Sequence, residues 1–137
     1  MKYDEFNSWR QKQVDDMPVK FAFSKEQFDR ILETLKPTPE NKLVSLPGGG
    51  YCLESDVESI ENIFQSIEDK FAELCQNESF LFDGFVYEMG NREYQFVQDD
   101  ELILDLFNKT TADLKTDPRL QQIYKKARKY YLSHCSY

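Results

Sequence analysis

The side chains best suited to covalent or metal chemistry are one histidine, His134, and three cysteines, Cys52, Cys75 and Cys135. A cysteine nucleophile needs a histidine within hydrogen-bonding distance, but adjacent helix positions point about 100° apart, so His134 and Cys135 cannot pair with each other. The four residues match a zinc site in number only, because they show no Cys-x-x-Cys or His-x-x-x-His spacing. We interpret Cys75 as a buried apolar side chain and predict no metal and no cofactor.

Carboxylates are numerous enough to consider a Mg²⁺-dependent enzyme that acts on nucleic acid. Hard oxygen ligands are those that Mg²⁺ prefers. No lysine stands two positions after Glu88 or Glu93 to complete the acidic-plus-lysine pattern of such nucleases. Solvated helix faces and helix caps are the simpler interpretation, and the metal-dependent enzyme is kept as the alternative. The candidate residues are Asp83, Glu88, Glu93, Asp99 and Asp100.

Three consecutive glycines after Pro47 indicate a tight turn, because glycine adopts positive φ without a Cβ clash and proline fixes its own φ. The alternative is a phosphate-binding loop at a helix N-terminus. Such a loop requires Lys and Ser or Thr directly after the last glycine, whereas Tyr51 and Cys52 follow here. We therefore predict a hairpin turn that presents a binding surface. The candidate binding residues are Gly48, Gly49, Gly50, Tyr51 and Trp9.

Charge is distributed unevenly along the chain, whose net charge is −8. Residues 118–137 hold five of the 17 basic side chains and none of the 25 acidic ones, so residues 1–117 form an acidic body. The basic C-terminal helix could contact nucleic acid, with Tyr130 and Tyr137 available for stacking. Otherwise its apolar side, including His134, docks on the body. The acidic body opposes binding to nucleic acid, which is therefore the alternative partner. The basic face comprises Arg119, Lys125, Lys126, Arg128 and Lys129.

Periodicity and capping signals predict the elements that position these residues. A short strand is expected over residues 19–23, and a hairpin over residues 43–46 and 51–53. Residues 108–116 are expected to form a polar connection. Helices are predicted over residues 2–16, about 25–36 after Ser24, 57–74, from Asp99 or Asp100 through Phe107, and from Pro118 onward. The predicted class is α+β, with about five to six helices and a small antiparallel β-hairpin.

The most regular of these helices is that over residues 57–74. Its apolar residues recur at alternating spacings of three and four: Val57, Ile60, Phe64, Ile67, Phe71 and Leu74. This pattern predicts a core helix covered by the other elements. The alternative is a seam between two copies, although the run is shorter than the three to four heptads of a coiled coil.

Residues 79–97 contain two conflicting signals. Asp83-Gly84 between apolar runs is typical of a hairpin, and Tyr94 and Phe96 alternate as in a strand. Phe82, Phe85, Val86 and Met89, in contrast, fit one helical face. Local pattern alone leaves both structures open.

The length of 137 residues predicts one domain over residues 1–137, large enough for a core without metal or disulfide support. The first 17 residues contain no apolar run, so we expect neither a signal peptide nor a membrane span. An odd number of cysteines without paired spacing is typical of reduced thiols. We expect a cytoplasmic protein.

Four segments of the sequence carry a resemblance to a known family: KFAFSKEQFDRILETL, LPGGGYCLESDVESIENIF, FVYEMGNREYQF and DDELILDLF. The chain resembles a family of small uncharacterised proteins of gut-bacterial genomes, found in prophages and conjugative elements, over about residues 5–107. Met89-Gly90 departs from the Leu and small helix-former expected there. The resemblance implies a helix over about residues 79–93, an intracellular setting and no known activity. We therefore favour a non-catalytic module that binds another protein.

Overall fold

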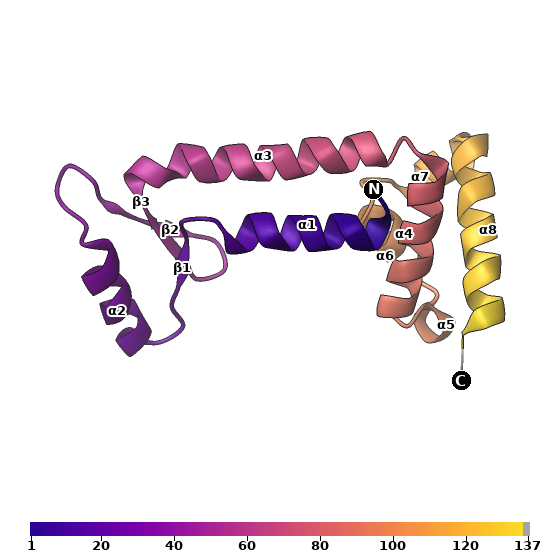
Figure 1. Cartoon of the computed structure of the whole chain (residues 1–137). Coiled ribbons are helices and arrows are strands. Elements are labelled where there is room, and N and C mark those ends of the chain that lie inside the picture. Colours follow the sequence, from indigo (N-terminus) through magenta and orange to yellow (C-terminus); the bar gives the residue numbers. More distant parts are fainter. Residues whose placement is uncertain (136–137) are drawn as a thin grey trace. The chain divides into compact units, whose positions relative to one another are not determined.

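The computed structural model describes residues 1–135, in which the chain forms eight α-helices and a small antiparallel sheet (Figure 1). The helices are α1 (Tyr3–Asp15), α2 (Lys25–Leu35), α3 (Val57–Leu74), α4 (Glu78–Asn91), α5 (Tyr94–Val97), α6 (Asp100–Asp105), α7 (Thr111–Thr116) and α8 (Pro118–His134). The strands are β1 (Lys20–Phe21), β2 (Leu43–Leu46) and β3 (Gly50–Leu53). The predominantly helical α+β class is confirmed, with more helices than the five to six expected.

The chain forms two compact units. The first unit combines residues 1–7 with the chain from Lys70 onward, and the second is the continuous segment 8–69. A single domain over residues 1–137 stays a prediction.

The sheet lies in the second unit and extends the predicted hairpin by one strand. β2 and β3 are antiparallel, with Leu43 opposite Leu53. β1 pairs with the other side of β3, where Lys20 lies opposite Tyr51, so the strand order is β1-β3-β2. α2 packs on this sheet through Phe28, whose ring lies 5.1 Å from that of Tyr51. β1 is therefore an outer strand of the sheet.

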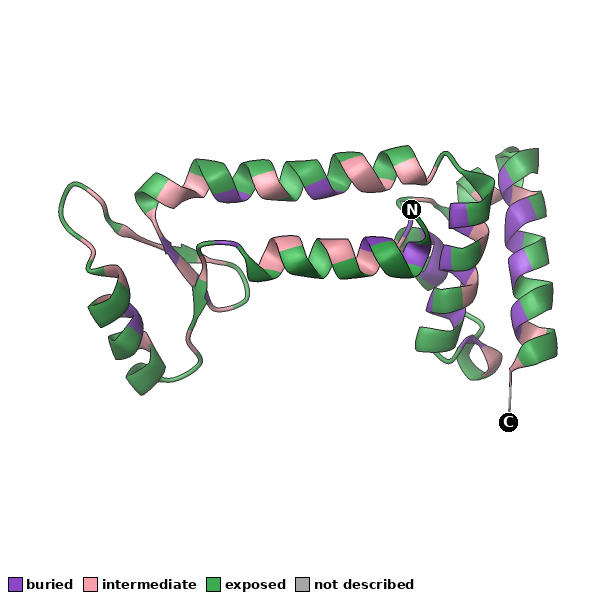
Figure 2. Ribbon diagram, in the orientation of Figure 1, coloured by how far each residue is buried: buried purple, intermediate pink, exposed green. Residues whose placement is uncertain are grey.

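The first unit has an aromatic core between α4 and α8, where buried residues concentrate (Figure 2). Phe85 of α4 is fully buried, and its ring centroid lies 4.8 Å from that of Phe107 and 5.1 Å from that of Tyr124 in α8. Tyr3 of α1 also enters this core and donates a hydrogen bond of 3.0 Å to the buried Glu88. The helix over residues 79–93 that the resemblance implied is confirmed as α4. Its aromatic residues serve helix packing and not a hairpin.

The helix predicted over residues 57–74 is confirmed as α3. The prediction that the other elements bury its apolar side is not. Of its six seam residues, only Ile60 and Ile67 are buried, and Phe64 remains 50% exposed. The deepest packing instead belongs to α4 and α8, whose apolar faces cover each other. The prediction of a core helix was therefore wrong about burial, although it was right about secondary structure.

Residues 108–116 were expected to be a polar connection and instead contain the short helix α7. Its start is fixed by a capping box, in which the Thr110 hydroxyl accepts from the Asp113 N–H at 3.1 Å and the Asp113 carboxylate accepts from the Thr110 N–H at 2.9 Å. These two bonds satisfy backbone donors that a helix start leaves free. α8 begins as predicted, with Asp117 as N-cap and Pro118 in the first turn.

A polar network joins α5, α6 and α8 of the first unit. One Asp100 oxygen accepts hydrogen bonds from the hydroxyls of Tyr94 and Tyr124, the latter at 2.6 Å. Arg128 donates to the Tyr94 hydroxyl at 3.0 Å. Both tyrosines are almost completely buried, and this burial, together with the hydrogen bond to Asp100, raises the pKa of each phenol. The network stabilises the neutral phenols inside the folded chain.

We expect this network to make stability fall at alkaline pH. Unfolded tyrosines lose their protons near pH 10. Tyr94 and Tyr124 keep theirs above that pH while folded, so the native state binds more protons than the unfolded state and the free energy of unfolding falls as pH rises. Denaturation at several pH values above about 9 should show a shallower fall for Tyr124→Phe than for the wild type. Tyr130→Phe, at an exposed position, should keep the wild-type slope. Equal slopes for the wild type and Tyr124→Phe would contradict this origin.

Candidate protein-binding surface

The structure explains why two of the three residues of the triglycine turn are glycine. Gly48 and Gly49 have φ of +82° and +83°, the left-handed region in which a side chain is strained. A Cβ on Gly49 would lie 2.8 Å from the Phe23 ring, and the Gly49 carbonyl accepts from the Ala22 N–H at 3.1 Å. The turn therefore fits closely against the chain that follows β1. Gly50 belongs to β3 and is buried.

Tyr51 and Trp9, the aromatic partners proposed for this turn, are both half-buried. Tyr51 lies within β3 and packs against Phe28, so its ring contributes to the packing of α2 on the sheet. Trp9 lies in α1. Neither residue lines either of the two surface hollows described below. A shared pocket of Tyr51 and Trp9 stays a prediction.

Two other aromatic residues beside the turn are more exposed. Phe21 of β1 and Phe23, two residues later, have exposed fractions of 55% and 77%. Residues 19–23 alternate as a strand does, and sequence reasoning used this pattern to predict the strand but did not select its rings as a site. We call Phe21, Phe23 and the outward backbone of β1 the β1 edge. The sequence signal for the β1 edge is the alternation of Phe21 and Phe23, which does not show whether the two rings are covered.

A hollow of about 290 Å³ lies between β1 and α2, and Phe21 of the β1 edge lines it. Two cationic side chains line it, Lys20 of the strand and Arg30 of the helix, and no acidic residue does. Neither cation forms an ion pair within residues 1–135. Gln27, which also lines the hollow, accepts a hydrogen bond of 2.7 Å from the Phe23 N–H through its side-chain oxygen. This bond ties the end of the β1 edge to α2.

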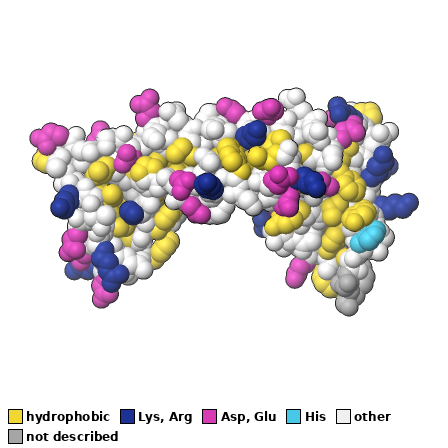
Figure 3. All heavy atoms as spheres, viewed as in Figure 1, with side chains coloured by type: hydrophobic (Ala, Val, Ile, Leu, Met, Phe, Trp, Pro, Cys, Tyr) yellow, Lys and Arg dark blue, Asp and Glu magenta, His cyan; other side chains and the backbone are white. Residues whose placement is uncertain are grey.

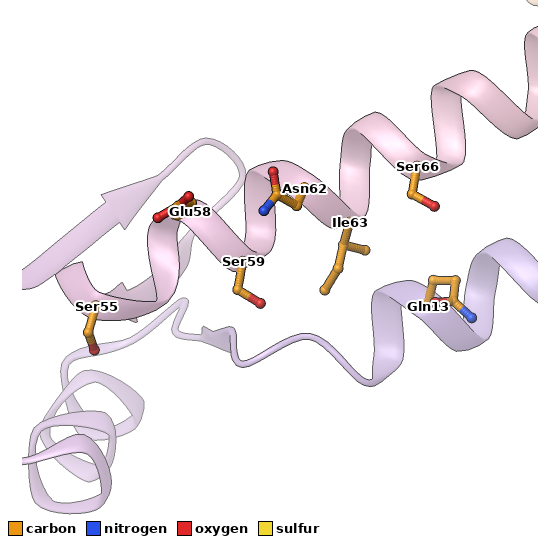
Figure 4. Close-up of a pocket in the computed structure, with 7 residues that line it drawn as sticks. All are labelled: Gln13, Ser55, Glu58, Ser59, Asn62, Ile63 and Ser66. Atoms are coloured by element: carbon orange, nitrogen blue, oxygen red, sulfur yellow. The ribbon is translucent and has the colours of Figure 1, made fainter.

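A larger hollow of about 470 Å³ also belongs to the second unit (Figure 4). It lies mainly along α3, and Gln13 of α1 lines its other side. Its lining is mostly hydroxyl and amide groups, with Ile63 as its apolar member and Glu58 as its charged one. General acid–base chemistry needs titratable groups that converge on one site, and this hollow offers a single one.

Of the five candidate carboxylates of a metal site, Asp83 and Glu93 are exposed, and the other three make separate contacts. Glu88 accepts from Tyr3 and lies 3.8 Å from the guanidinium of Arg92. Asp99 caps α6, and Asp100 binds two tyrosines. In the described part of the chain, no three residues among His, Cys, Asp and Glu are grouped so that they could hold a metal ion. The geometry gives the Mg²⁺-dependent alternative no support.

The thiols and the histidine are likewise not combined. Cys52 is buried in β3, and burial raises the pKa of the half-buried Cys75 thiol to about 11. A thiol with so high a pKa is a poor nucleophile at neutral pH. His134 was expected on the docking side of α8, which is wrong, because it is exposed and stacks on Tyr130 at 4.1 Å between ring centroids. Its imidazole Nδ1 lies 2.8 Å from the Tyr130 carbonyl oxygen.

The basic face of α8 is partly used within the first unit. Arg119 pairs with Glu78 of α4 at 2.5 Å, and Arg128 donates to Tyr94. The three lysines, Lys125, Lys126 and Lys129, are exposed and form no ion pair among the described residues. Lys and Arg side chains project from the side of α8 that faces away from α4 (Figure 3). Tyr137, named as a stacking residue, lies outside the described residues.

Comparison with known proteins adds a family but no activity. The model of a family of unknown function, DUF7659, matches residues 2–130. This match includes most of α8, which the resemblance over residues 5–107 left out. No curated protein and no solved structure matches the chain. In residues 1–135, no helix has both the length and the apolar character required to cross a bilayer.

Proposed function

We propose that this chain, which belongs to the DUF7659 family of unknown function, is a non-catalytic protein-binding module that contacts its partner through the β1 edge. The observation that carries the proposal is the exposure of two phenylalanines at an outer strand, Phe21 within β1 and Phe23 two residues later. Exposed aromatic groups are typical of protein interfaces, where they supply much of the binding energy.

The β1 edge is favoured over the other exposed apolar residues because it also offers backbone groups. Phe96 and Val97 are comparably exposed, but they lie in the one-turn helix α5. The N–H groups of both residues already donate to the Glu93 carbonyl oxygen, at 3.0 Å and 3.3 Å. An outer strand has one side without a neighbour and can pair with an added segment. The β1 edge thus combines apolar contact with directional hydrogen bonding.

The resemblance described above supports a setting for this module. Small proteins of phages and mobile elements often act by binding a host or element protein, and a regulatory role in the bacterial cytoplasm is part of the proposal. The reduced cysteines agree with that compartment.

The test is affinity capture from the native host with three forms of the chain: wild type, Phe21→Ser/Phe23→Ser and Phe64→Ser. Phe64 is an exposed phenylalanine of the same unit and serves as the matched control. We expect the wild type and the control to retain one protein that the double variant loses, at least about tenfold, since two interface aromatics contribute 1–2 kcal/mol or more. Circular dichroism should show that all three forms are folded. Capture of the same proteins by all three forms would refute the proposal.

A further inference from the structure

We infer that the partner segment is an extended polypeptide with alternating apolar and acidic side chains, which pairs with β1 and places a carboxylate between Lys20 and Arg30. This inference rests on the proposed function, because it specifies what occupies the β1 edge. It follows from the backbone pattern of β1, from the sidedness of its residues and from the charge of the adjacent hollow.

The backbone pattern shows which groups face outward. The Ala22 N–H donates a hydrogen bond to the Gly49 carbonyl oxygen of the neighbouring chain segment. Two residues earlier on β1, Lys20 lies opposite Tyr51 of β3. In an antiparallel ladder, hydrogen-bonded and non-hydrogen-bonded pairs alternate, so the intervening residue Phe21 directs its N–H and C=O away from β3. The N–H of Phe23 is already bound by Gln27. Phe21 therefore provides the donor and acceptor that an added strand would use.

Side-chain alternation determines the sequence pattern of that strand. Neighbouring residues of a strand point to opposite faces of the sheet, so Lys20 and Phe21 lie on different faces. The Phe21 ring lies on the face of Gly50, as a Cβ built on that glycine would be 3.4 Å from it. A segment paired with β1 would alternate in the same way. Phe21 lines the hollow together with Lys20, so the hollow lies at the edge of β1, beside the position of an added strand. One set of the side chains of that strand would meet Phe21, and the other would meet Lys20.

The charge of the hollow specifies the second set. Lys20 and Arg30 line it without an acidic neighbour in the lining and without an ion pair in residues 1–135. The chain as a whole has a net charge of −8, so this concentration of positive charge runs against its composition. Complementary charge at an interface selects partners and register. A glutamate or aspartate side chain of the partner meets both cations.

The probe for this inference is an eight-residue peptide that alternates valine with glutamate and has proline at both ends to prevent self-association. A second peptide has lysine in place of glutamate. Titration into the ¹⁵N-labelled full chain, followed by NMR, should shift the amide signals of residues 19–23 and 27–34. We expect the glutamate peptide to bind about three- to tenfold more tightly than the lysine peptide, the range for two partly exposed ion pairs.

Charge reversal provides the decisive comparison. In Lys20→Glu/Arg30→Glu the preference should reverse towards the lysine peptide. Lys25→Glu/Lys42→Glu, which changes the net charge equally at exposed positions that do not line the hollow, should keep the wild-type preference. The inference is overturned if neither peptide shifts these signals, if both bind equally, or if reversal at Lys20 and Arg30 leaves the preference unchanged. Host capture that depends on Phe21 and Phe23 would still support the proposed function in each of those cases.

Discussion

Replacing Asp100 with alanine is expected to lower the free energy of unfolding by about 2–4 kcal/mol. The change removes the acceptor of two hydrogen bonds and leaves the hydroxyls of Tyr94 and Tyr124 without it. Both side chains are almost completely buried, so water cannot readily replace the carboxylate. Hydrogen bonds to a charged group contribute about 1.5–3 kcal/mol each, and the loss of one partner leaves the other unsatisfied. Urea denaturation at neutral pH measures the effect.

The matched control for Asp100→Ala is Glu101→Ala. Both residues are acidic and lie in the first turn of α6, where negative charge favours the helix, but Glu101 is exposed. The control should therefore cost no more than about 1 kcal/mol, the usual contribution of such a charge. Equal losses for the two variants would show that the helix start, and not the tyrosine network, depends on Asp100.

Alanine at Gly84 is expected to destabilise the chain by about 1–3 kcal/mol, although alanine is the better helix former. An added Cβ would lie 2.6 Å and 2.7 Å from two ring carbons of Phe107 and 2.9 Å from the Tyr3 ring. These rings are themselves buried and belong to the aromatic core, so they cannot move aside at low cost. Chemical denaturation of Gly84→Ala gives the magnitude.

Gly90 allows the same substitution in the same helix with the opposite sign. The nearest atom to a Cβ at this position is a Tyr131 ring carbon at 3.8 Å, which is ordinary van der Waals contact. Gly90→Ala should therefore raise the free energy of unfolding by up to about 1 kcal/mol through helix propensity. A stabilising effect at Gly84 would mean that α4 and the Phe107 ring do not approach as closely as described.

Helix boundaries were predictable wherever a residue with specific backbone chemistry marked them. Ser24 begins α2 and Asp117 with Pro118 begins α8, as expected. The α7 helix carried an equally clear signal in Thr110 and Asp113, but the polar composition of residues 108–116 obscured it. Asp83-Gly84 gave the opposite error, because this pair is typical of a hairpin and here lies inside a helix. The glycine is needed there because two rings approach the helix backbone.

Burial was less predictable than secondary structure. An amphipathic pattern shows that a helix has an apolar side but does not show what covers it. Phe64 fits the α3 seam as well as Ile60 does, yet the first is half exposed and the second is buried. α4 has apolar residues over much of its surface, and such a helix is the better candidate for a central position.

The candidate surface could be located from the sequence only in part. The glycine turn was recognised, but its exposed aromatic neighbours were not, because an alternating strand does not reveal which of its faces is covered. The pairing of β1 with β3 joins segments about 30 residues apart and places Phe21 at an edge. The same pairing brings Lys20 near Arg30 of α2, in one hollow. Such juxtapositions come from tertiary structure and have no local signature.

The first unit is built from both ends of the chain, and this has a consequence for synthesis on the ribosome. Tyr3 bonds to Glu88, 85 positions later, and its ring packs against Phe107. Protein synthesis proceeds from the N-terminus, so the first residues wait for their partners to be translated. The second unit is one continuous segment of residues 8–69 and has all of its sequence available much earlier. A nascent chain would therefore have the whole sheet available before the partners of Tyr3 are translated.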